Sequence, residues 1–419
     1  MTKMTAKMTD EQKKAFDIMR SGQNIFLTGN AGTGKSFLLK HFIDYAEKEG
    51  LKVLVTAPTG IAAINVGGST VHRTFKVPLE PMSPGAKTKT PSAVKEADII
   101  IIDEISMVRA DVFQYVARVI AKAEEKAEKH IQLIVVGDFF QLPPVITKAD
   151  KQALISLWGY DLQEGFAFEA PMWKNFRFQN IVLKDTIRQS DPVFIGTLNG
   201  LRKGDFKNTA TLKQITAEKW QTSAIYLCGT NREANDFNNR KLEEINAPEF
   251  TFESKVQGKV GAGDKPVEDT IRLKVGARVM VVINDILGNY QNGSMGSIEE
   301  IDADKTKITV KLDNDKTAVI GPHVWEIVEY DVSCGRLQKN IIGTFEQLPL
   351  KLGYAITIHK SQGQTFESVN INPSCFCEGQ LYVGLSRCTS AGNLYLNSPY
   401  INQRWLKTSR KVIAFYNSL

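Results

Sequence analysis

The sequence predicts an α/β protein with two domains built on parallel sheets, together with a β-rich insertion. Short apolar runs that suit buried strands alternate with helical patterns in both halves of the chain, which is typical of parallel sheets covered by helices. The segment at about 248–346 is instead rich in β-branched residues and in turn signals such as Asn292-Gly293. A length of 419 residues allows two or three domains, each with its own core.

The composition is that of an ordinary globular protein, with 42% hydrophobic and 23% charged residues, so disorder is not expected. The longest apolar runs, such as 99–102, are far too short to cross a bilayer, and residues 1–7 lack the apolar core of a signal peptide. Five scattered cysteines, with Cys375 and Cys377 at a spacing unsuited to zinc, favour reduced thiols. We expect a cytoplasmic protein without a membrane segment. Its net charge of +6 permits a nucleic-acid partner without requiring one.

The first half opens with a helix whose start is marked by Thr9 as N-cap and by Gln12 as its capping-box partner. Four apolar runs then predict strands at 24–28, 53–56, 99–102 and 131–136. Helical patterns follow the first two strands and occupy about 111–129. A Pro- and Lys-rich stretch at 76–95 interrupts this alternation.

The second half repeats the alternation on either side of the β-rich segment. Apolar runs predict strands at 224–228, 368–371 and 393–396, and helical patterns occupy 231–244 and 378–387. No short internal repeat is visible, although the two α/β halves have the same kind of pattern. We therefore expect two related α/β domains, with the β-rich segment inserted in the second.

A glycine-rich motif with the full phosphate-loop pattern follows the first predicted strand and opens a helix. Its residues are Gly29, Asn30, Ala31, Gly32, Thr33, Gly34, Lys35 and Ser36. Glycines let the backbone form a concave nest whose N–H groups contact phosphate oxygens, and the helix N-terminus adds its positive end. In this pattern Lys35 reaches the β- and γ-phosphates of ATP, and the Ser36 hydroxyl binds Mg²⁺. A chance glycine turn is the alternative, but it does not account for both flanking elements.

Two adjacent carboxylates, Asp103 and Glu104, follow a run of four isoleucines. This position puts both at the carboxyl end of a buried strand, which is the edge of a parallel sheet where ligands bind. Asp103 is expected to hold Mg²⁺, and Glu104 to orient and deprotonate the attacking water. The alternative is a solvated acidic turn.

Three further residues are weaker candidates for the nucleotide site. Gln141 follows the strand at 131–136, where a glutamine can contact the γ-phosphate and report its presence. Arg188 and Arg387 are candidates for the arginines that stabilise charge on the transferred phosphoryl group. Either arginine could instead be a surface salt-bridge partner.

A phosphate loop and an acidic pair indicate an ATPase and no more, because kinases, transporters and GTPases share both. The choice is narrowed by the order and spacing of eight blocks, at 29–36, 56–63, 70–72, 103–107, 137–144, 188–189, 358–365 and 381–387. Through these blocks the chain resembles superfamily-one helicases of the 5′-to-3′ branch. It is most similar to the PIF family (named for petite integration frequency), with RecD-like enzymes as the nearest relatives.

The resemblance implies two RecA-like P-loop domains and two insertions. The first domain (1A) is expected at 1–188, with a small wedge insertion (1B) at about 73–96. The second (2A) is expected at 189–247 and 347–419, and an SH3-like β-barrel (2B) is expected at 248–346.

The resemblance also implies roles for individual residues. Gln12 is expected to read the adenine edge, Arg188 and Arg387 to reach the γ-phosphate from the second domain, and Gly363 and Gln364 to link the strand to the nucleotide. The expected contacts with the single strand are Pro58, Thr59, Gly60, Thr70 and His72 in the first domain and His359, Lys360 and Ser361 in the second.

The function implied is that of an ATP-dependent DNA helicase that moves 5′ to 3′ on single-stranded DNA and unwinds tailed or forked duplexes as a monomer. The cofactors implied are ATP and Mg²⁺, and the family is tied to DNA repair, recombination and telomere maintenance. Three alternatives remain open at this point: an ATP-gated clamp that binds single strands without unwinding, an RNA helicase, and a P-loop transferase or metabolic kinase.

Overall fold

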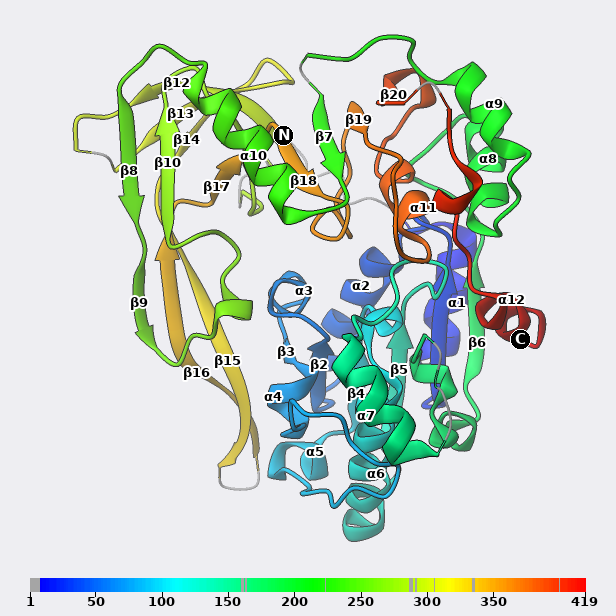
Figure 1. Cartoon of the computed structure of the whole chain (residues 1–419). Coiled ribbons are helices and arrows are strands. Elements are labelled where there is room, and N and C mark those ends of the chain that lie inside the picture. Colours follow the sequence, from blue (N-terminus) through cyan, green and yellow to red (C-terminus); the bar gives the residue numbers. More distant parts are fainter. Residues whose placement is uncertain are drawn as a thin grey trace. The chain divides into compact units, whose positions relative to one another are not determined.

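In a computed structural model of the chain, the strands predicted in the first half lie in one six-stranded sheet (Figure 1). The structure describes residues 8–159, 162, 164–222, 224–285, 289–290, 292–304, 306–333, 336–398 and 400–419. All pairs in this sheet are parallel. The strand order is β3 (Ser69–Thr70), β2 (Val53–Ala57), β4 (Ile99–Ile102), β5 (Gln132–Val136), β1 (Ile25–Gly29) and β6 (Gln179–Leu183). Strand β5 therefore lies between β1, which leads into the phosphate loop, and β4, which leads into the acidic pair.

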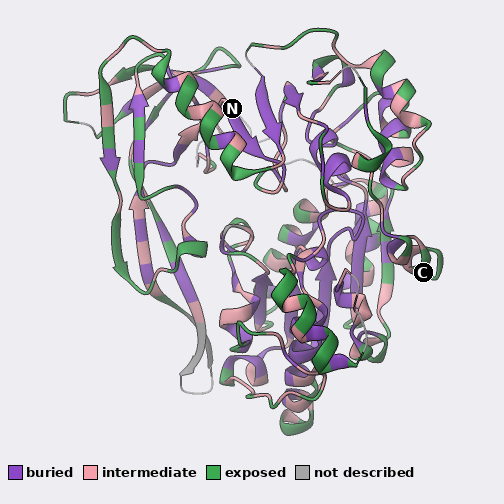
Figure 2. Ribbon diagram, in the orientation of Figure 1, coloured by how far each residue is buried: buried purple, intermediate pink, exposed green. Residues whose placement is uncertain are grey.

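Both faces of this sheet are apolar and covered, as expected for a parallel sheet. On one face, alternate strand residues such as Ile101 and Ile134 form a buried cluster with Leu38 and Phe42. On the other face, Phe26 packs against Phe139. The four inner strands β1, β2, β4 and β5 are buried along their length, whereas the edge strand β6 alternates between buried and exposed residues (Figure 2). The helices of this part of the chain are α1 (Asp10–Met19), α2 (Lys35–Lys48), α3 (Gly60–Asn65), α4 (Val71–Phe75), α5 (Ser92–Glu96), α6 (Ala110–Ala127) and α7 (Lys148–Trp158).

A second, smaller parallel sheet is formed by the later α/β segments. Its strand order is β18 (Ala355–Thr357), β7 (Ile225–Cys228), β19 (Val369–Ile371) and β20 (Leu394–Leu396). The helices of the second half are α8 (Pro192–Arg202), α9 (Asn208–Ile215), α10 (Asn231–Glu243), α11 (Gln380–Leu385) and α12 (Arg410–Asn417). These two parallel sheets with their helices confirm the predicted α/β class with two RecA-like domains.

The segment predicted as a β-rich insertion is antiparallel. Its largest sheet has the order β14 (Thr317–Ile320), β13 (Ile308–Leu312), β12 (Met295–Ile301), β11 (Arg278–Val281) and β17 (Leu350–Leu352). One smaller sheet pairs β10 (Thr270–Lys274) with β8 (Glu249–Glu253). In the other, β16 (Arg336–Gln347) lies between β15 (His323–Ser333) and β9 (Lys255–Gly258). Strand β17 joins the largest sheet although it lies after the predicted boundary at 346, because it pairs with β11.

The chain divides into two compact units. Unit 1 comprises Met1–Ile187, Val328–Ile341 and Ala414–Leu419, and unit 2 comprises Arg188–Ile327 and Ile342–Ile413. The prediction that 347–419 belongs wholly to the second α/β domain is corrected at its end. The last six residues belong to unit 1, because Phe415 packs against Phe26 in the core of the six-stranded sheet.

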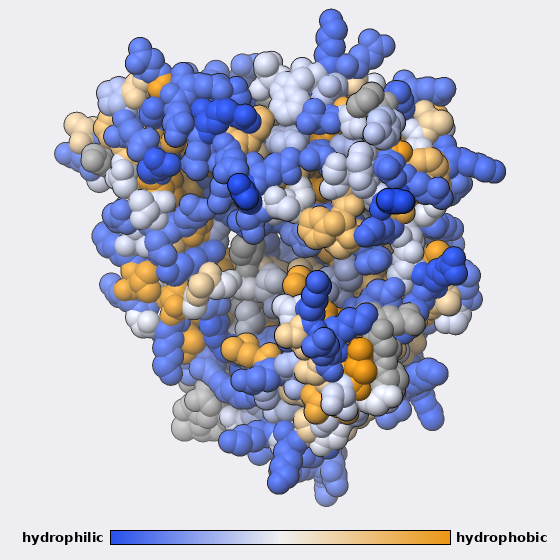
Figure 3. Space-filling view, viewed as in Figure 1, coloured by the Kyte–Doolittle hydropathy of each residue, from blue (hydrophilic) through white to orange (hydrophobic). Residues whose placement is uncertain are grey.

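The local signals in the sequence were accurate. The capping box of Thr9 and Gln12 is present, and the four isoleucines form β4 with the predicted bounds. Hydrophilic side chains predominate on the face shown in Figure 3, with hydrophobic ones in small separate groups. Among the residues that the structure describes, no helix is both long enough and apolar enough to cross a membrane.

Candidate functional site

The phosphate loop connects β1 to α2, and its backbone requires glycine. A Cβ atom on Gly29 would lie 2.4 Å from the carbonyl oxygen of Leu183, and one on Gly34 would lie 2.4 Å from Nε2 of Gln12. Gly34 also has a φ of +79°, in the left-handed region that favours glycine. These close approaches explain why the motif has glycine at both positions.

The lysine of the loop is held by the loop itself. The ammonium of Lys35 donates to the carbonyl oxygens of Gly29 at 2.8 Å and Asn30 at 3.0 Å. The hydroxyl of the buried Thr33 donates to the same carbonyl of Asn30 at 3.0 Å. The loop is therefore ordered around a positive charge at the position where phosphate is expected.

The side chain of Gln12 is buried against the phosphate loop. Its Nε2 donates to the carbonyl oxygen of Thr33 at 3.2 Å, and its Oε1 accepts from the backbone N–H of Thr9 at 3.1 Å. The backbone N–H of Ile187 donates to the carbonyl oxygen of Gly32 at 2.8 Å. Two segments far apart in sequence thus hold the loop from outside.

The acidic pair lies at the end of β4, at the same edge of the sheet as the phosphate loop. Burial, and after it the charge of Glu104, raises the pKa of Asp103 to about 7, while a hydrogen bond from the Glu104 N–H and the charge of Lys35 act in the opposite direction. That hydrogen bond to Oδ1 of Asp103 is 2.9 Å long. The phosphate loop with Lys35 and the acidic pair with Asp103 therefore lie at one edge of the parallel sheet, near enough for the charge of Lys35 to act on Asp103.

Glu104 has an unusual backbone conformation. Its φ is +50° and its ψ +46°, in the left-handed region that residues other than glycine rarely occupy. Such strain persists only where the surrounding structure imposes it, and it concentrates at functional sites. This residue stands between the end of β4 and the short 3-10 helix at Ile105–Met107.

Gln141 follows β5, the strand between β1 and β4. Its backbone N–H donates to the carbonyl oxygen of Asp138 at 2.9 Å, and its side chain is buried. Oδ1 of Asp138 accepts from the N–H of Phe140 at 3.1 Å, which closes a tight turn. Two hydrogen bonds therefore define the shape of the loop 137–141, and Gln141 follows the strand that lies between those leading to the phosphate loop and to the acidic pair.

In unit 2 the two candidate arginines lie together around Ser386. Nη1 of Arg188 donates to the carbonyl oxygen of Ser386 at 3.1 Å, and Nη2 of Arg387 donates to its hydroxyl at 2.9 Å. Arg387 also donates to the carbonyl oxygens of Val383 at 2.9 Å and Gln364 at 3.3 Å. Burial lowers the pKa of Arg188. Because only 2% of Arg387 is exposed, the alternative of a surface salt-bridge role does not hold for it.

The residues of unit 1 that are candidates for contact with single-stranded DNA lie at the ends of two adjacent β-strands. Parallel β2 and β3 pair Ala57 with Thr70. Thr59 and Thr70 are the N-caps of α3 and α4, and each hydroxyl accepts a backbone N–H at 3.2 Å. Pro58 and His72 are half-buried and Gly60 is buried. Burial, and after it the charge of Arg109, lowers the pKa of His72.

The candidates of unit 2 occupy the turn after β18. Lys360 is exposed, and His359 is half-buried with its ring stacked 6.3 Å from that of Phe376. Burial lowers the pKa of His359. Ser361 differs from the expectation of a direct contact, because its side chain is completely buried and its hydroxyl donates to the carbonyl oxygen of Ile358 at 2.7 Å. Its geometry fits a role in shaping the turn.

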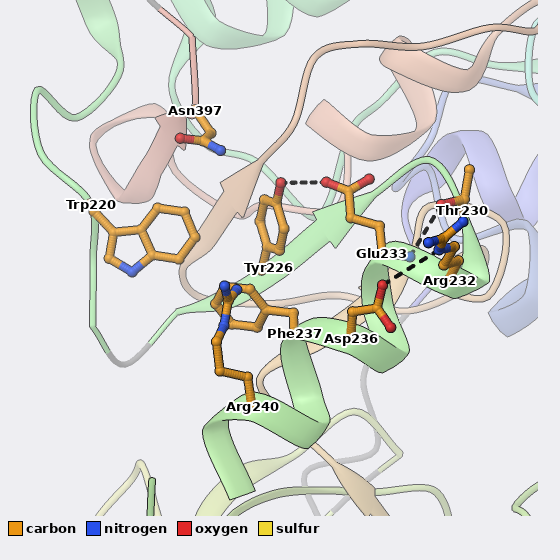
Figure 4. Close-up of a pocket in the computed structure, with 9 residues that line it drawn as sticks. All are labelled: Trp220, Tyr226, Thr230, Arg232, Glu233, Asp236, Phe237, Arg240 and Asn397. Atoms are coloured by element: carbon orange, nitrogen blue, oxygen red, sulfur yellow. Dashed lines mark hydrogen bonds and ion pairs between the residues drawn. The ribbon is translucent and has the colours of Figure 1, made fainter. Parts of the chain in front are cut away.

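A separate pocket of about 470 Å³ lies in unit 2 between α10 and the loop before β7 (Figure 4). The rings of Trp220, Tyr226 and Phe237 line it, and the guanidinium of Arg240 lies 5.3 Å from the centre of the Phe237 ring. The hydroxyl of Tyr226 donates to Oε1 of Glu233 at 2.6 Å. None of the lining residues lies in the eight sequence blocks that carry the family resemblance.

One contact to the nucleotide site was missed by sequence reasoning. Tyr416, near the end of the chain, forms hydrogen bonds with Thr28 and Asp138. Thr28 precedes the phosphate loop, and Asp138 precedes Gln141. The sequence does not predict a role for Tyr416, because this residue lies outside the eight sequence blocks that carry the family resemblance.

The arrangement matches known proteins along nearly the whole chain. The model of the PIF1-like helicase family matches residues 7–211. The ATP-dependent DNA helicase Pif1 of Campylobacter jejuni is 31% identical, over 94% of this chain and 94% of that protein. A crystal structure of Bacteroides sp Pif1 in complex with ADP-AlF4 is 32% identical with a TM-score of 0.86, covering 98% of this chain and 96% of that one. A structure of two coordinating Pif1 helicases unwinding forked double-stranded DNA is 32% identical with a TM-score of 0.69, covering 98% and 97%.

Proposed function

The chain belongs to the PIF1-like family of ATP-dependent DNA helicases, and from this premise we propose that it moves 5′ to 3′ along single-stranded DNA and unwinds duplex ahead of it. Membership in the family removes the alternative of a P-loop transferase or metabolic kinase. The direction of movement and the coupling of hydrolysis to strand separation are the proposed parts.

The proposed nucleotide site consists of the phosphate loop, the acidic pair and Gln141. Lys35 binds the β- and γ-phosphates, and Gln12 holds the loop and meets the adenine edge. Asp103 and the Ser36 hydroxyl supply oxygen atoms of the kind that Mg²⁺ prefers, and the buried carboxylate of Asp103 fits a cation because a positive charge favours its ionised form. When bound, Mg²⁺ offsets negative charge on the phosphates.

Hydrolysis in this proposal depends on Glu104 and on two arginines. Glu104 orients the attacking water and accepts its proton. Arg188 and Arg387 contact the γ-phosphate when ATP is bound and stabilise the charge that develops on it. Both are tied to Ser386, and Arg387 also contacts the carbonyl of Gln364 in the turn that carries His359 and Lys360. In this proposal, these hydrogen bonds connect the arginines that contact the nucleotide to the turn of unit 2 that contacts the DNA strand.

The proposed grip on DNA is mostly a grip on phosphates. Thr59 and Thr70 offer hydroxyls at the ends of two neighbouring strands, and Lys360 offers an exposed charge. Contacts of this kind carry little sequence information. We propose single-stranded DNA with a tailed or forked duplex as the substrate and a monomer as the minimal active form.

The observation that carries the proposal is the meeting of Lys35 and Asp103 at one sheet edge in a chain that matches DNA helicases over its length. The decisive experiment measures unwinding of duplexes that bear either a 5′ or a 3′ single-stranded tail, with Lys35→Ala as the inactive control. We expect strand separation of the 5′-tailed duplex alone. Unwinding of the 3′-tailed duplex alone would reverse the proposed direction.

A hydrolysis assay and duplexes with RNA tails, added to this experiment, separate the two remaining alternatives. ATP hydrolysis that responds to single strands without strand separation on any tailed duplex would favour the ATP-gated clamp. Unwinding of duplexes with RNA tails in preference to those with DNA tails would favour an RNA helicase.

Protein titrated from below to above the DNA concentration then tests the monomer, because a cooperative rise in rate would show that more than one copy is needed.

A further inference from the structure

We infer that Tyr416 is a positioning residue for ATP hydrolysis, because its hydroxyl ties the strand that leads into the phosphate loop to the loop that carries Gln141. The inference rests on the proposed role of the nucleotide site. It adds to that site a residue that lies outside every motif of the family resemblance.

Three described hydrogen bonds join the hydroxyl of Tyr416 to other residues of unit 1. It lies 2.6 Å from Oγ1 of Thr28, accepts from the backbone N–H of Phe139 at 3.2 Å and donates to Oδ1 of Asp138 at 3.3 Å. Since its single proton goes to Asp138, Thr28 acts as the donor in the shortest of the three bonds. The phenol oxygen thus joins β1 to the loop after β5.

The partners of this hydroxyl are buried and close to the proposed chemistry. Thr28 and Asp138 are both completely buried. Thr28 is the residue before Gly29, where the phosphate loop begins. Asp138 accepts the N–H of Gln141 on its carbonyl and the N–H of Phe140 on its carboxylate. A change at Tyr416 therefore acts on both sides of the expected γ-phosphate position.

The ring of Tyr416 is held in place by aromatic packing. It lies 4.8 Å from the ring of Phe140, and the neighbouring Phe415 is stacked on Phe168 at 4.4 Å. Phe415 also packs against Phe26 and Phe139 at 5.9 and 5.5 Å. Because the rings supply the anchoring, removal of the hydroxyl alone should leave the fold intact.

The chain passes from unit 2 to unit 1 within α12. Residues 410–413 of this helix belong to unit 2, and residues 414–417 belong to unit 1. The hydroxyl contact is therefore made by the helix in which the chain returns to the nucleotide-binding unit.

The test compares Tyr416→Phe with the unchanged protein in ATP hydrolysis saturated with single-stranded DNA. Loss of the hydroxyl should lower kcat by about three- to tenfold while KM for ATP stays within about twofold, because the phosphate contacts remain but Gln141 and the phosphate loop are no longer held in register. Tyr400→Phe, at an exposed tyrosine of unit 2, is the matched control and should leave kcat unchanged.

Two variants of Thr28, which contacts the Tyr416 hydroxyl, keep the test independent of any folding defect in Tyr416→Phe. Thr28→Val removes the hydroxyl that Tyr416 contacts and should lower kcat, whereas Thr28→Ser keeps a hydroxyl and should restore most of the rate. Combining Thr28→Val with Tyr416→Phe should cost less than the product of the two single effects, because both remove the same bond.

The outcome that overturns the inference is a Tyr416→Phe protein with a lower Tm and an unchanged kcat, since the hydroxyl would then only stabilise the core. Additive effects of Thr28→Val and Tyr416→Phe would also overturn it. Failure of the proposed function looks different, because the unchanged protein itself would then lack hydrolysis stimulated by single strands.

Discussion

The side-chain amide of Gln12 donates to the carbonyl oxygen of Thr33 at 3.2 Å, so a residue of the first helix is fixed on the phosphate loop. The same side chain caps its own helix through Thr9. One glutamine thus joins helix initiation to the shape of the loop, and the two roles should be lost together.

Gln12→Ala should lower the free energy of unfolding by about 1–2 kcal/mol, because a cap and a buried hydrogen bond disappear. It should also raise KM for ATP. Urea unfolding and steady-state kinetics measure the two effects. The control is Lys13→Ala, which removes an exposed ion pair with Asp10 from the same helix and should change neither value appreciably. An unchanged KM would argue against the contact with the nucleotide.

Replacement of Glu104 should separate chemistry from folding. Glu104→Gln should reduce turnover at least about 100-fold while ATP still binds, because the phosphate loop and Asp103 remain. Glu104→Gly should be equally inactive yet raise the free energy of unfolding by about 1 kcal/mol, because glycine relieves the left-handed backbone. A fluorescent nucleotide, a hydrolysis assay and urea unfolding measure these effects. Retained unwinding by either variant would exclude Glu104 as the base.

The two arginines should differ in what their loss does to the fold. Arg387→Ala removes three described hydrogen bonds from a buried site and should lower stability by about 1–3 kcal/mol as well as abolish hydrolysis. Arg188→Ala, at a half-buried residue, should abolish hydrolysis with a smaller loss of stability. Thermal unfolding beside a hydrolysis assay tests the contrast. Normal hydrolysis by a folded variant would exclude that arginine from the site.

His359 and Lys360 should contribute differently to binding of single strands. Burial keeps His359 largely neutral at pH 7, so His359→Ala should weaken the stimulation of hydrolysis without changing the salt dependence of binding. Lys360→Ala should reduce the slope of log affinity against log salt by about 0.7, the value for one phosphate contact on a single strand. Fluorescence anisotropy measures both slopes when affinity is determined at about ten salt concentrations between about 50 and 300 mM. Equal slopes for Lys360→Ala and the unchanged protein would remove that contact.

Lys351 should make the stability of the protein depend on pH. Burial, and after it the charge of Lys360, lowers the pKa of Lys351 to about 8, against a smaller effect of Glu268. Below pH 8 the folded protein bears the cost of a partly buried ammonium, and stability rises from pH 8 to about 10.5 as only the unfolded chain remains protonated. Lys351→Met should therefore be more stable by about 2 kcal/mol at pH 7.

The advantage of Lys351→Met should shrink towards zero at pH 10. Urea unfolding of both proteins at pH 7 and pH 10 measures this difference, and a comparison of the two proteins cancels the titration of all other groups. A constant advantage across this range would mean that packing, rather than charge, sets the effect.

The parts of the fold that follow from short stretches of sequence were the ones predicted. The isoleucines of β4, the capping box of Thr9 and the phosphate loop each depend on neighbouring residues, so local pattern is enough to find them. The predicted strand at 24–28 and the observed β1 differ by one residue at each end, because backbone pairing rather than apolarity sets where a strand stops.

Long-range relationships could not be predicted in the same way. Nothing around Tyr416 indicates that its hydroxyl reaches Thr28, 388 positions away, and nothing around Ser361 indicates that its side chain is buried. The left-handed conformation of Glu104 was also not predicted, since glutamate has no preference for it. These features depend on packing between distant segments, which a single sequence does not display.

The position of Phe415 has a consequence for biosynthesis. A ribosome adds residues from the N-terminus, and domains generally begin to fold in that order. The aromatic face formed by Phe26, Phe139 and Phe168 must therefore wait through the translation of more than half the chain before its last ring is made. During that interval the nascent protein presents an incomplete apolar surface, which makes it a natural client for chaperones that shield such surfaces during translation.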